Sequence, residues 1–250
     1  MRVIPIPPLS MTAFMELSDA QLMLPLTEIL KDTRYARCLA AATQRSDYLI
    51  LDNGEAEGKR IDWKHLLSIA EAYGVSEIVL PDVMGNAEET LQAIKQVWFG
   101  RPQQYRYMGV AQGENGTQVR EMIEYLISLG VQTIGLPRHM VRSRPQARLE
   151  ILQWMTLTGQ DTLAEIHLLG MNPTFPGELE LIRQEGYSDV VRSVDTSMPF
   201  VAALANRELR HNQDILPPRP EGYFLAEFTE EQTAQAMRNL RWLRGEPITE

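Results

Sequence analysis

Short apolar segments of this chain end in carboxylate or amide side chains at several places. The residues in these positions are Asp52, Asp82, Gln112 and Asp195. A concentration of carboxylates costs free energy unless a substrate, a metal ion or shared protons use it. Taken singly, an aspartate after a strand is also a common helix N-cap. Taken together, the four residues predict one acidic site.

Paired carboxylates are typical of glycosyl transfer. One carboxylate can attack an anomeric carbon while others manage protons and the leaving group, which gives a covalent intermediate and overall retention. A metal site is the competing chemistry. No histidine accompanies these aspartates at ligand spacing, and the sole cysteine is Cys38, so we expect no transition-metal site. The residues leave an all-oxygen Mg²⁺ site open.

The elements that would position these residues alternate regularly between apolar β-rich segments and helical patterns. The predicted strands are Asp47–Asp52, Glu77–Pro81, Tyr105–Ala111, Gln132–Leu136, Glu165–Leu169 and Asp189–Val194. With 250 residues and 44% hydrophobic content, the pattern predicts an α/β fold, namely a TIM-type (β/α)8 barrel that is irregular or incomplete at its ends. The carboxyl ends of barrel strands form the active-site face, so the four polar residues would meet there.

Closing the barrel requires two further strands. The candidates are an N-terminal segment, either Arg2–Ile6 or the region around Leu22–Leu24, and the segment Tyr223–Phe228. We expect one domain over residues 1–250, with a core at about 45–206 and a C-terminal strand and helix at about 222–244. A doubly wound open sheet is the alternative fold, but the first βα turn lacks a G-x-G-x-x-G fingerprint.

The chain carries a formal net charge of −9, which opposes general affinity for nucleic acid because that affinity comes from excess Lys and Arg. Positive charge is nevertheless crowded into one stretch. Its residues are Arg138, His139, Arg142, Arg144 and Arg148. The stretch is either a solvated loop and helix face or a local contact to nucleic acid, for which we select Arg138, Arg142 and Arg144.

The compartment follows from what the sequence does not contain. A single cysteine cannot form an internal disulfide, the N-terminus does not resemble a signal peptide, and no apolar stretch approaches the roughly 18 residues that span a bilayer. We expect a cytoplasmic protein with no membrane partner. The oligomeric state stays open.

Two neighbouring strands carry further polar residues. His167 lies within a strand, where a packed or hydrogen-bonded histidine is more common than a general base. Alternation along the strand of Asp195 places Ser193 inside the barrel and Arg192 outward or at the rim.

The strand ends also carry short motifs in a fixed order. They are Leu51-Asp52-Asn-Gly54, Pro81-Asp82, Gly109-Val-Ala-Gln112-Gly113, Gly135-Leu, His167-Leu-Leu-Gly170 and Ser193-Val-Asp195-Thr-Ser197. In order and spacing, these motifs resemble the tRNA-guanine transglycosylase superfamily. The resemblance covers Asp47 to Asn206.

The resemblance implies a role for each catalytic position. Asp195 matches the nucleophile that attacks C1′ of the target nucleotide. Asp52 matches the strand-end aspartate that assists proton handling. No metal or organic cofactor is implied for the reaction.

The resemblance also implies how the base is bound. Asp82 and Gln112 match the groups that read the purine edge, because a carboxylate accepts from guanine N–H groups and an amide donates to O6. Gly135 matches a loop glycine whose backbone touches the base. The motif glycines Gly113 and Gly170 are assigned to the same substrate site.

The chain departs from the tRNA enzymes in two respects. It lacks their Cys-x-Cys-x-x-Cys…His zinc site, and their Asp-Ser-Gly-Gly motif is replaced by Asp52-Asn-Gly54-Glu55. It looks more like the compact phage and bacterial branch that exchanges guanine in DNA for a 7-deazaguanine.

We therefore expect a base-exchange transglycosylase with DNA, or else tRNA, as polymer substrate and a 7-deazaguanine as incoming base. Two rivals remain. A non-catalytic partner subunit of the same fold would lack the nucleophile at Asp195. A small-metabolite barrel lyase or aldolase would generally show a strand-end lysine or a phosphate-binding glycine loop, and neither is evident.

Overall fold

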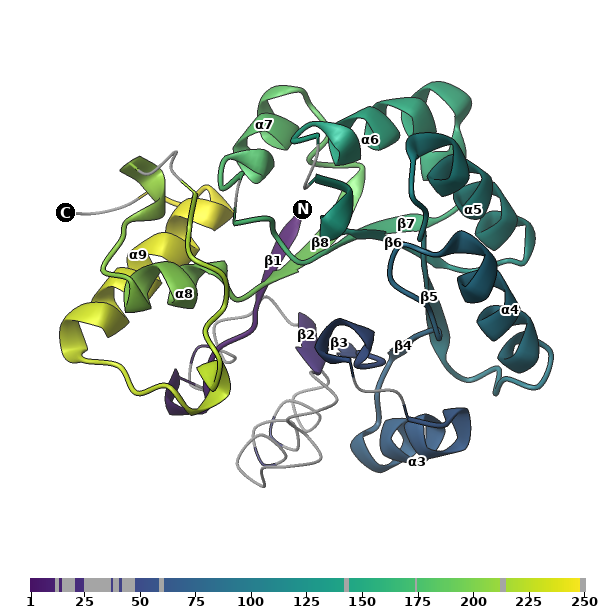
Figure 1. Ribbon diagram of the computed structural model, residues 1–250, viewed down its shortest axis with the longest axis horizontal. Helices are drawn as coiled ribbons and strands as arrows, with labels where there is room; N and C mark the ends of the chain where they lie inside the picture. Colours follow the sequence, from purple (N-terminus) through teal and green to yellow (C-terminus); the bar gives the residue numbers. More distant parts are fainter. Residues whose placement is uncertain are drawn as a thin grey trace.

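The computed structural model describes residues 1–11, 14, 21–24, 37, 41, 48–58, 61–141, 144–173, 175–211 and 215–247. Its centre is one eight-stranded sheet in which all the pairings are parallel (Figure 1). The strands are β1 (Arg2–Pro5), β2 (Gln21–Leu24), β3 (Tyr48–Leu51), β4 (Glu77–Val79), β5 (Arg106–Val110), β6 (Thr133–Pro137), β7 (Glu165–Leu169) and β8 (Val191–Thr196).

Helices follow the strands and cover the outside of the sheet (Figure 1). The α-helices are α3 (Trp63–Tyr73), α4 (Ala87–Trp98), α5 (Gly116–Ser128), α6 (Ala147–Thr158), α7 (Glu178–Gln184), α8 (Met198–Leu204) and α9 (Glu230–Arg244). The 3₁₀ turns are η2 (Glu55–Glu57), η3 (Arg138–Val141), η4 (Gln160–Thr162), η5 (Leu209–His211) and η6 (Tyr223–Leu225).

The strand order around the sheet is β2 to β8 in chain order, with β1 placed beyond β8. Arg2 of β1 pairs with Ser193 of β8, so the first strand lies against the last. Within the described residues no ladder joins β1 to β2, although the two strands lie near each other. The fold is therefore a (β/α)8 barrel that is incomplete at the β1/β2 seam, as the sequence predicts.

The helices pack on the sheet through amphipathic faces. In α5 the buried residues are Val119, Met122, Ile123 and Leu126, which is the 3.6-residue period expected for a helix with one side in the core. Helices α8 and α9 lie side by side next to β1 (Figure 1), and α9 begins with a capping box between Thr229 and Gln232. The predicted C-terminal helix is thus confirmed.

The predicted strand at Tyr223–Phe228 is wrong. This segment forms the 3₁₀ turn η6 after a proline-rich stretch, and the Tyr223 hydroxyl donates to the Ile6 carbonyl at 2.5 Å. The aromatic residues are buried against the barrel without entering the sheet. Both N-terminal candidates, in contrast, supply strands. The predicted start at Asp47 lies outside the described residues.

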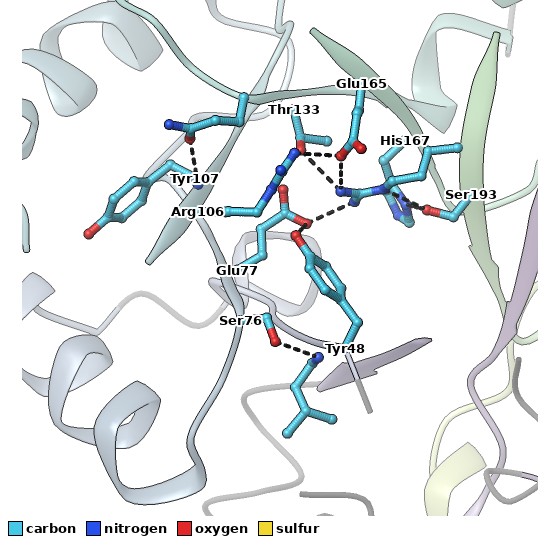
Figure 2. Close-up of polar contacts among 12 residues, drawn as sticks. Tyr48, Ser76, Glu77, Arg106, Tyr107, Thr133, Glu165, His167 and Ser193 are labelled. Carbon is cyan, nitrogen blue, oxygen red and sulfur yellow. Dashed lines mark hydrogen bonds and ion pairs between the residues drawn. The ribbon is translucent and has the colours of Figure 1, made fainter. Parts of the chain in front are cut away.

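The amino-terminal end of the barrel is closed by ion pairs (Figure 2). The Arg192 guanidinium donates to Glu77 Oε2 at 2.8 Å and to Glu165 Oε2 at 2.9 Å. It also donates to Thr133 Oγ1 at 3.1 Å, and the Tyr48 hydroxyl donates to the same Glu77 oxygen at 3.2 Å. Glu77 is fully buried. The Arg192 side chain therefore reaches from β8 across the amino-terminal end of the barrel to β4, β6 and β7 and does not point outward. Its neighbour Ser193 is fully buried, as the predicted interior position requires.

Candidate functional site

A cavity of about 160 Å³ opens at the carboxyl ends of the strands. Both walls and rim contain polar side chains, and an apolar floor is formed by Ile6, Val79, Val110 and Leu169. Six of the predicted site residues line this cavity: Asp52, Asp82, Gln112, Arg138, Gly170 and Asp195. The structure thus brings together the strand-end carboxylates and the strand-end amide, which are far apart in the sequence.

Three other predicted site residues, Gly113, Gly135 and Arg144, lie outside the cavity wall. A Cβ atom at Gly135 would lie 2.8 Å from Leu169 Cδ1, so the absence of a side chain at this position leaves space for Leu169. Arg144 is exposed and ion-paired with Glu150. Arg142 lies outside the described residues.

Asp195 is held through one of its two oxygens. Its Oδ1 accepts from the backbone N–H of Gly170 at 2.9 Å and is 3.1 Å from His167 Nε2. Within the described residues, Oδ2 has no hydrogen-bond partner. The side chain is 16% exposed, so this oxygen can meet a ligand in the cavity.

His167 connects Asp195 to the barrel interior. It is fully buried, and its Nδ1 lies 2.8 Å from Ser193 Oγ. The pairing register of β7 with β8 shifts between Ile166 and His167, so that His167 pairs with Ser193. The histidine is therefore hydrogen-bonded at both ring nitrogens, in line with the interpretation of a packed histidine.

The loop that presents Gly170 is fixed from behind by Arg148. Arg148 is fully buried, forms a two-point ion pair with Glu178, and donates to the Gly170 carbonyl at 2.9 Å. Gly170 adopts a φ of +67°, and a Cβ there would lie 3.1 Å from Arg138. A side chain at this position would therefore be strained as well as crowded. Arg148 has a structural role, and it is not on a solvated helix face.

Asp82 is the centre of a second group of polar residues. Its Oδ1 accepts from Asn53 Nδ2 at 2.6 Å, and its Oδ2 accepts from Gln112 Nε2. The Gln112 oxygen in turn accepts from the Gly85 N–H at 2.9 Å, which fixes the orientation of the amide. The helix that follows β4 is capped by Asn86, not by Asp82. Asp82 is therefore not a helix cap.

Several residues of the cavity wall were not predicted. Asn53 also donates to the Leu80 carbonyl at 2.7 Å, and the Asp-Asn-Gly turn after β3 was the available signal for it. Arg219 reaches the wall from the loop before η6, near the rings of Tyr223 and Phe224. No local pattern links that loop to the strand ends, so its contribution is visible only in three dimensions.

The described part of the chain contains no group of three or more His, Cys, Asp or Glu residues that could hold a metal ion. None of the helices in that part is long and apolar enough to cross a membrane.

The fold is shared with solved structures of low sequence similarity. A tryptophan synthase structure from M. tuberculosis matches at 11% identity over 97% of this chain and 92% of that chain, with a TM-score of 0.51. A mutant tryptophan synthase α-subunit from Pyrococcus furiosus matches at 13% identity over 98% of each chain, with a TM-score of 0.53. The putative copper homeostasis protein CutC from Streptococcus agalactiae matches at 15% identity over 79% of this chain and 99% of that chain, with a TM-score of 0.50.

No family model and no curated protein matches the sequence. At these identities the structural likeness establishes the barrel fold alone. It does not identify a substrate, because unrelated activities use this fold.

Proposed function

We propose that the protein is a base-exchange transglycosylase that replaces guanine in a polynucleotide, with DNA as the preferred polymer, by a 7-deazaguanine. The observation that carries the proposal is the arrangement of Asp195. Its Oδ1 accepts from the Gly170 N–H and lies 3.1 Å from His167 Nε2, its Oδ2 has no hydrogen-bond partner among the described residues, and the side chain lines the cavity. A carboxylate held in this way can attack an electrophilic carbon without first losing its own hydrogen bonds.

In the first half-reaction, Asp195 attacks C1′ of the target nucleotide. The C1′–N9 bond breaks, the guanine takes up a proton as it leaves, and a glycosyl ester forms on Asp195. Asp52, which lines the same cavity, would assist the proton transfer. In the second half-reaction, the ring nitrogen of the 7-deazaguanine attacks C1′ and gives up its proton, which regenerates the Asp195 carboxylate.

Base recognition would use the Asp82 group. A carboxylate accepts the N1–H and the exocyclic amine of guanine, and an amide N–H can donate to O6. Gln112 and Asn53 hold Asp82 by its two oxygens, so the carboxylate is oriented before a base arrives. Such preorganisation reduces the ordering cost of binding.

A polymer substrate has to present an unstacked nucleotide. Extruding a base costs a few kcal/mol in a duplex and less in a single strand, and contacts to the flanking phosphates would offset this cost. Arg138 lines the cavity next to Gly170, so it is the best-placed residue of the basic stretch. Arg142 and Arg144 would extend the contact along the polymer.

A second candidate is a barrel enzyme that acts on a small metabolite, such as a lyase. The match to tryptophan synthase structures over nearly the whole chain favours this candidate, because barrels of this kind commonly hold small-molecule sites at the carboxyl ends of their strands. The cavity volume of about 160 Å³ also fits a ligand of few atoms. A nucleobase is such a ligand, so the volume alone does not separate the two candidates.

One assay separates them. The protein is incubated with DNA or tRNA that carries labelled guanine, with and without a panel of 7-deazaguanines, and Asp195→Asn serves as the inactive control. We expect label release that requires an incoming base, and a covalent protein–polynucleotide adduct when the base is omitted. If neither polymer releases label and neither forms an adduct, the transglycosylase is refuted and the small-metabolite candidate remains.

A further inference from the structure

A continuous series of hydrogen bonds runs through the barrel from its amino-terminal end to Asp195. It begins at the ion pair between Glu77 and Arg192. Arg192 Nε lies 3.3 Å from Ser193 Oγ, and Ser193 Oγ lies 2.8 Å from His167 Nδ1. His167 Nε2 then lies 3.1 Å from Asp195 Oδ1. Figure 2 shows His167 and Ser193 next to the ion pairs at the end of the barrel.

The direction of each hydrogen bond follows from how many protons each group can donate, beginning with the Arg192 guanidinium. A guanidinium has only donors, so Ser193 Oγ accepts from Arg192. Ser193 is fully buried, and its hydroxyl has these two partners within the described residues. A hydroxyl could also accept from both partners, but its own proton would then be buried without an acceptor, which costs free energy. We therefore assign this proton to the bond with His167 Nδ1, which makes Nδ1 the unprotonated nitrogen. The imidazole proton is then on Nε2 and is donated to Asp195.

This orientation bears on what His167 can do. A neutral imidazole with its lone pair occupied by Ser193 and its proton committed to a carboxylate has no site left to take a proton from a substrate. The donation also occupies Asp195 Oδ1 together with the Gly170 N–H. The side chain of Asp195 is thereby fixed with Oδ2 towards the cavity.

We propose that His167 is a positioning residue for Asp195, held in the Nε2–H tautomer by Ser193 and Arg192, and that it is not a general base. The mechanistic half of this proposal rests on the proposed function, in which Asp195 is the nucleophile. The tautomer itself does not depend on that function, so the two can fail separately.

The tautomer is measured by ¹⁵N NMR of the imidazole nitrogens in the full chain. We expect the His167 Nδ1 signal in the range of an unprotonated nitrogen and the Nε2 signal in the range of a protonated one, whereas the exposed His65 shows exchange between forms. Ser193→Ala should remove this fixed pattern, and Ser128→Ala, which changes an exposed hydroxyl on α5, should not. A protonated Nδ1 in the wild type would overturn the proposal.

The mechanistic half is tested with two substitutions of different chemistry. In His167→Gln the amide nitrogen replaces Nε2 as a donor, but the side chain cannot act as a base. In His167→Leu the donor is lost. If His167 positions Asp195, the Gln variant keeps kcat within about tenfold of the wild type, and the Leu variant loses about a hundredfold in kcat with little change in KM.

The control is His65→Gln, on the exposed face of α3. Equal loss in a folded Gln variant and the Leu variant would overturn the positioning role in favour of a base. If the Leu variant fails to fold, the Gln variant and the NMR measurement still decide. If the wild-type protein shows no base-exchange activity at all, the proposed function fails. The NMR measurement still tests the hydrogen-bond series in that case.

Discussion

The two ends of the barrel use acidic residues in opposite ways. At the amino-terminal end, Glu77 and Glu165 are paired with the guanidinium of Arg192. At the carboxyl end, Asp195 is held by a histidine and a backbone N–H, and Asp82 is held by amide side chains. The two groups that hold Asp195 Oδ1 are thus a backbone N–H and an imidazole, whereas the carboxylates at the amino-terminal end are held by a guanidinium.

The difference shows that Asp195 lines the cavity without an arginine partner among the described residues. The carboxylates that arginines neutralise, Glu77 and Glu165 at the amino-terminal end and Glu178 behind Gly170, lie outside the cavity wall. A carboxylate neutralised by an arginine stabilises the fold, but it is a poor nucleophile because the cation competes for its lone pairs. A carboxylate oriented by neutral donors keeps its charge for a ligand. Barrel enzymes in general place catalysis at the carboxyl end of their strands, which is the end where Asp195 lines the cavity of this chain.

The largest expected effect is at the carboxyl end. Asp195→Asn keeps the shape of the side chain and an oxygen that can accept from Gly170, but it removes the anionic nucleophile. We expect the exchange rate to fall by roughly three orders of magnitude or more, with polymer affinity retained in a filter-binding assay. Turnover near the wild-type rate would contradict the assignment of the nucleophile.

At the opposite end, the expected effect is on stability. Glu77→Ala leaves Arg192 without its buried partner and should lower the free energy of unfolding by about 3 kcal/mol, measured by urea denaturation. The matched control is Glu150→Ala, which breaks the exposed pair with Arg144 and should cost less than about 1 kcal/mol. Equal losses in the two variants would contradict a special role for the closed end.

Base recognition should show an intermediate effect. Asp82→Ala leaves guanine donors unpaired in the cavity, which should reduce kcat/KM by a factor equivalent to about 1–3 kcal/mol. The control is Asp62→Ala, because Asp62 caps α3 and lies away from the cavity. That variant should lose about 1 kcal/mol of stability and none of the specificity for guanine. Wild-type use of guanine by Asp82→Ala would remove it from the recognition group.

The basic rim should show a smaller effect that depends on salt. Arg138→Gln should weaken polymer binding for every sequence and reduce the log–log salt slope by about one for each lost phosphate contact. Arg144→Gln, whose side chain is already ion-paired, should change the slope less. An unchanged slope in both variants would move the polymer path away from this stretch.

The smallest effect concerns alkaline pH at the closed end. Burial, followed by the charge of Glu77, raises the pKa of Tyr48 above its usual value. With rising pH the phenol ionises first in the unfolded state, while it stays protonated in the folded state. Its contribution to the free energy of unfolding is therefore fully present below about pH 10 and is lost as the pH rises beyond that. Tyr48→Phe should therefore cost about 1 kcal/mol at neutral pH, and the difference from the wild type should shrink in denaturant titrations above pH 10.

The regular part of the fold could be predicted from the sequence because its signals are local. The alternation of apolar segments and helical patterns located six inner strands to within a few residues, and α5 lies between two of them with one apolar face buried. The segment Tyr223–Phe228 misled for the same reason. Its aromatic residues suit a strand, but they are buried by packing on Ile6 and on each other, which no local pattern reveals.

The candidate site shows the same division. Strand-end position was sufficient to find Asp52, Asp82, Gln112 and Asp195, since parallel strands bring their ends together. The hydrogen bond between His167 and Asp195 depends on an irregular register between β7 and β8. The support of Gly170 by Arg148 depends on a buried side chain of α6 that reaches the loop after β7. Both contacts are properties of the packed molecule, and no pattern in the sequence predicts them.

The pairing of β1 with β8 has a consequence for how the protein is made. The N-terminal amino group donates to the Ser188 carbonyl, 187 positions later, and Ile6 contributes to the cavity floor. During synthesis on a ribosome, β1 therefore stays unpaired with β8 until β8 itself has emerged. Contacts between such distant segments slow folding, and exposed strand edges invite association with other chains in the meantime. The protein should thus depend on folding assistance early in its life, and its site should be assembled only in the final step of folding.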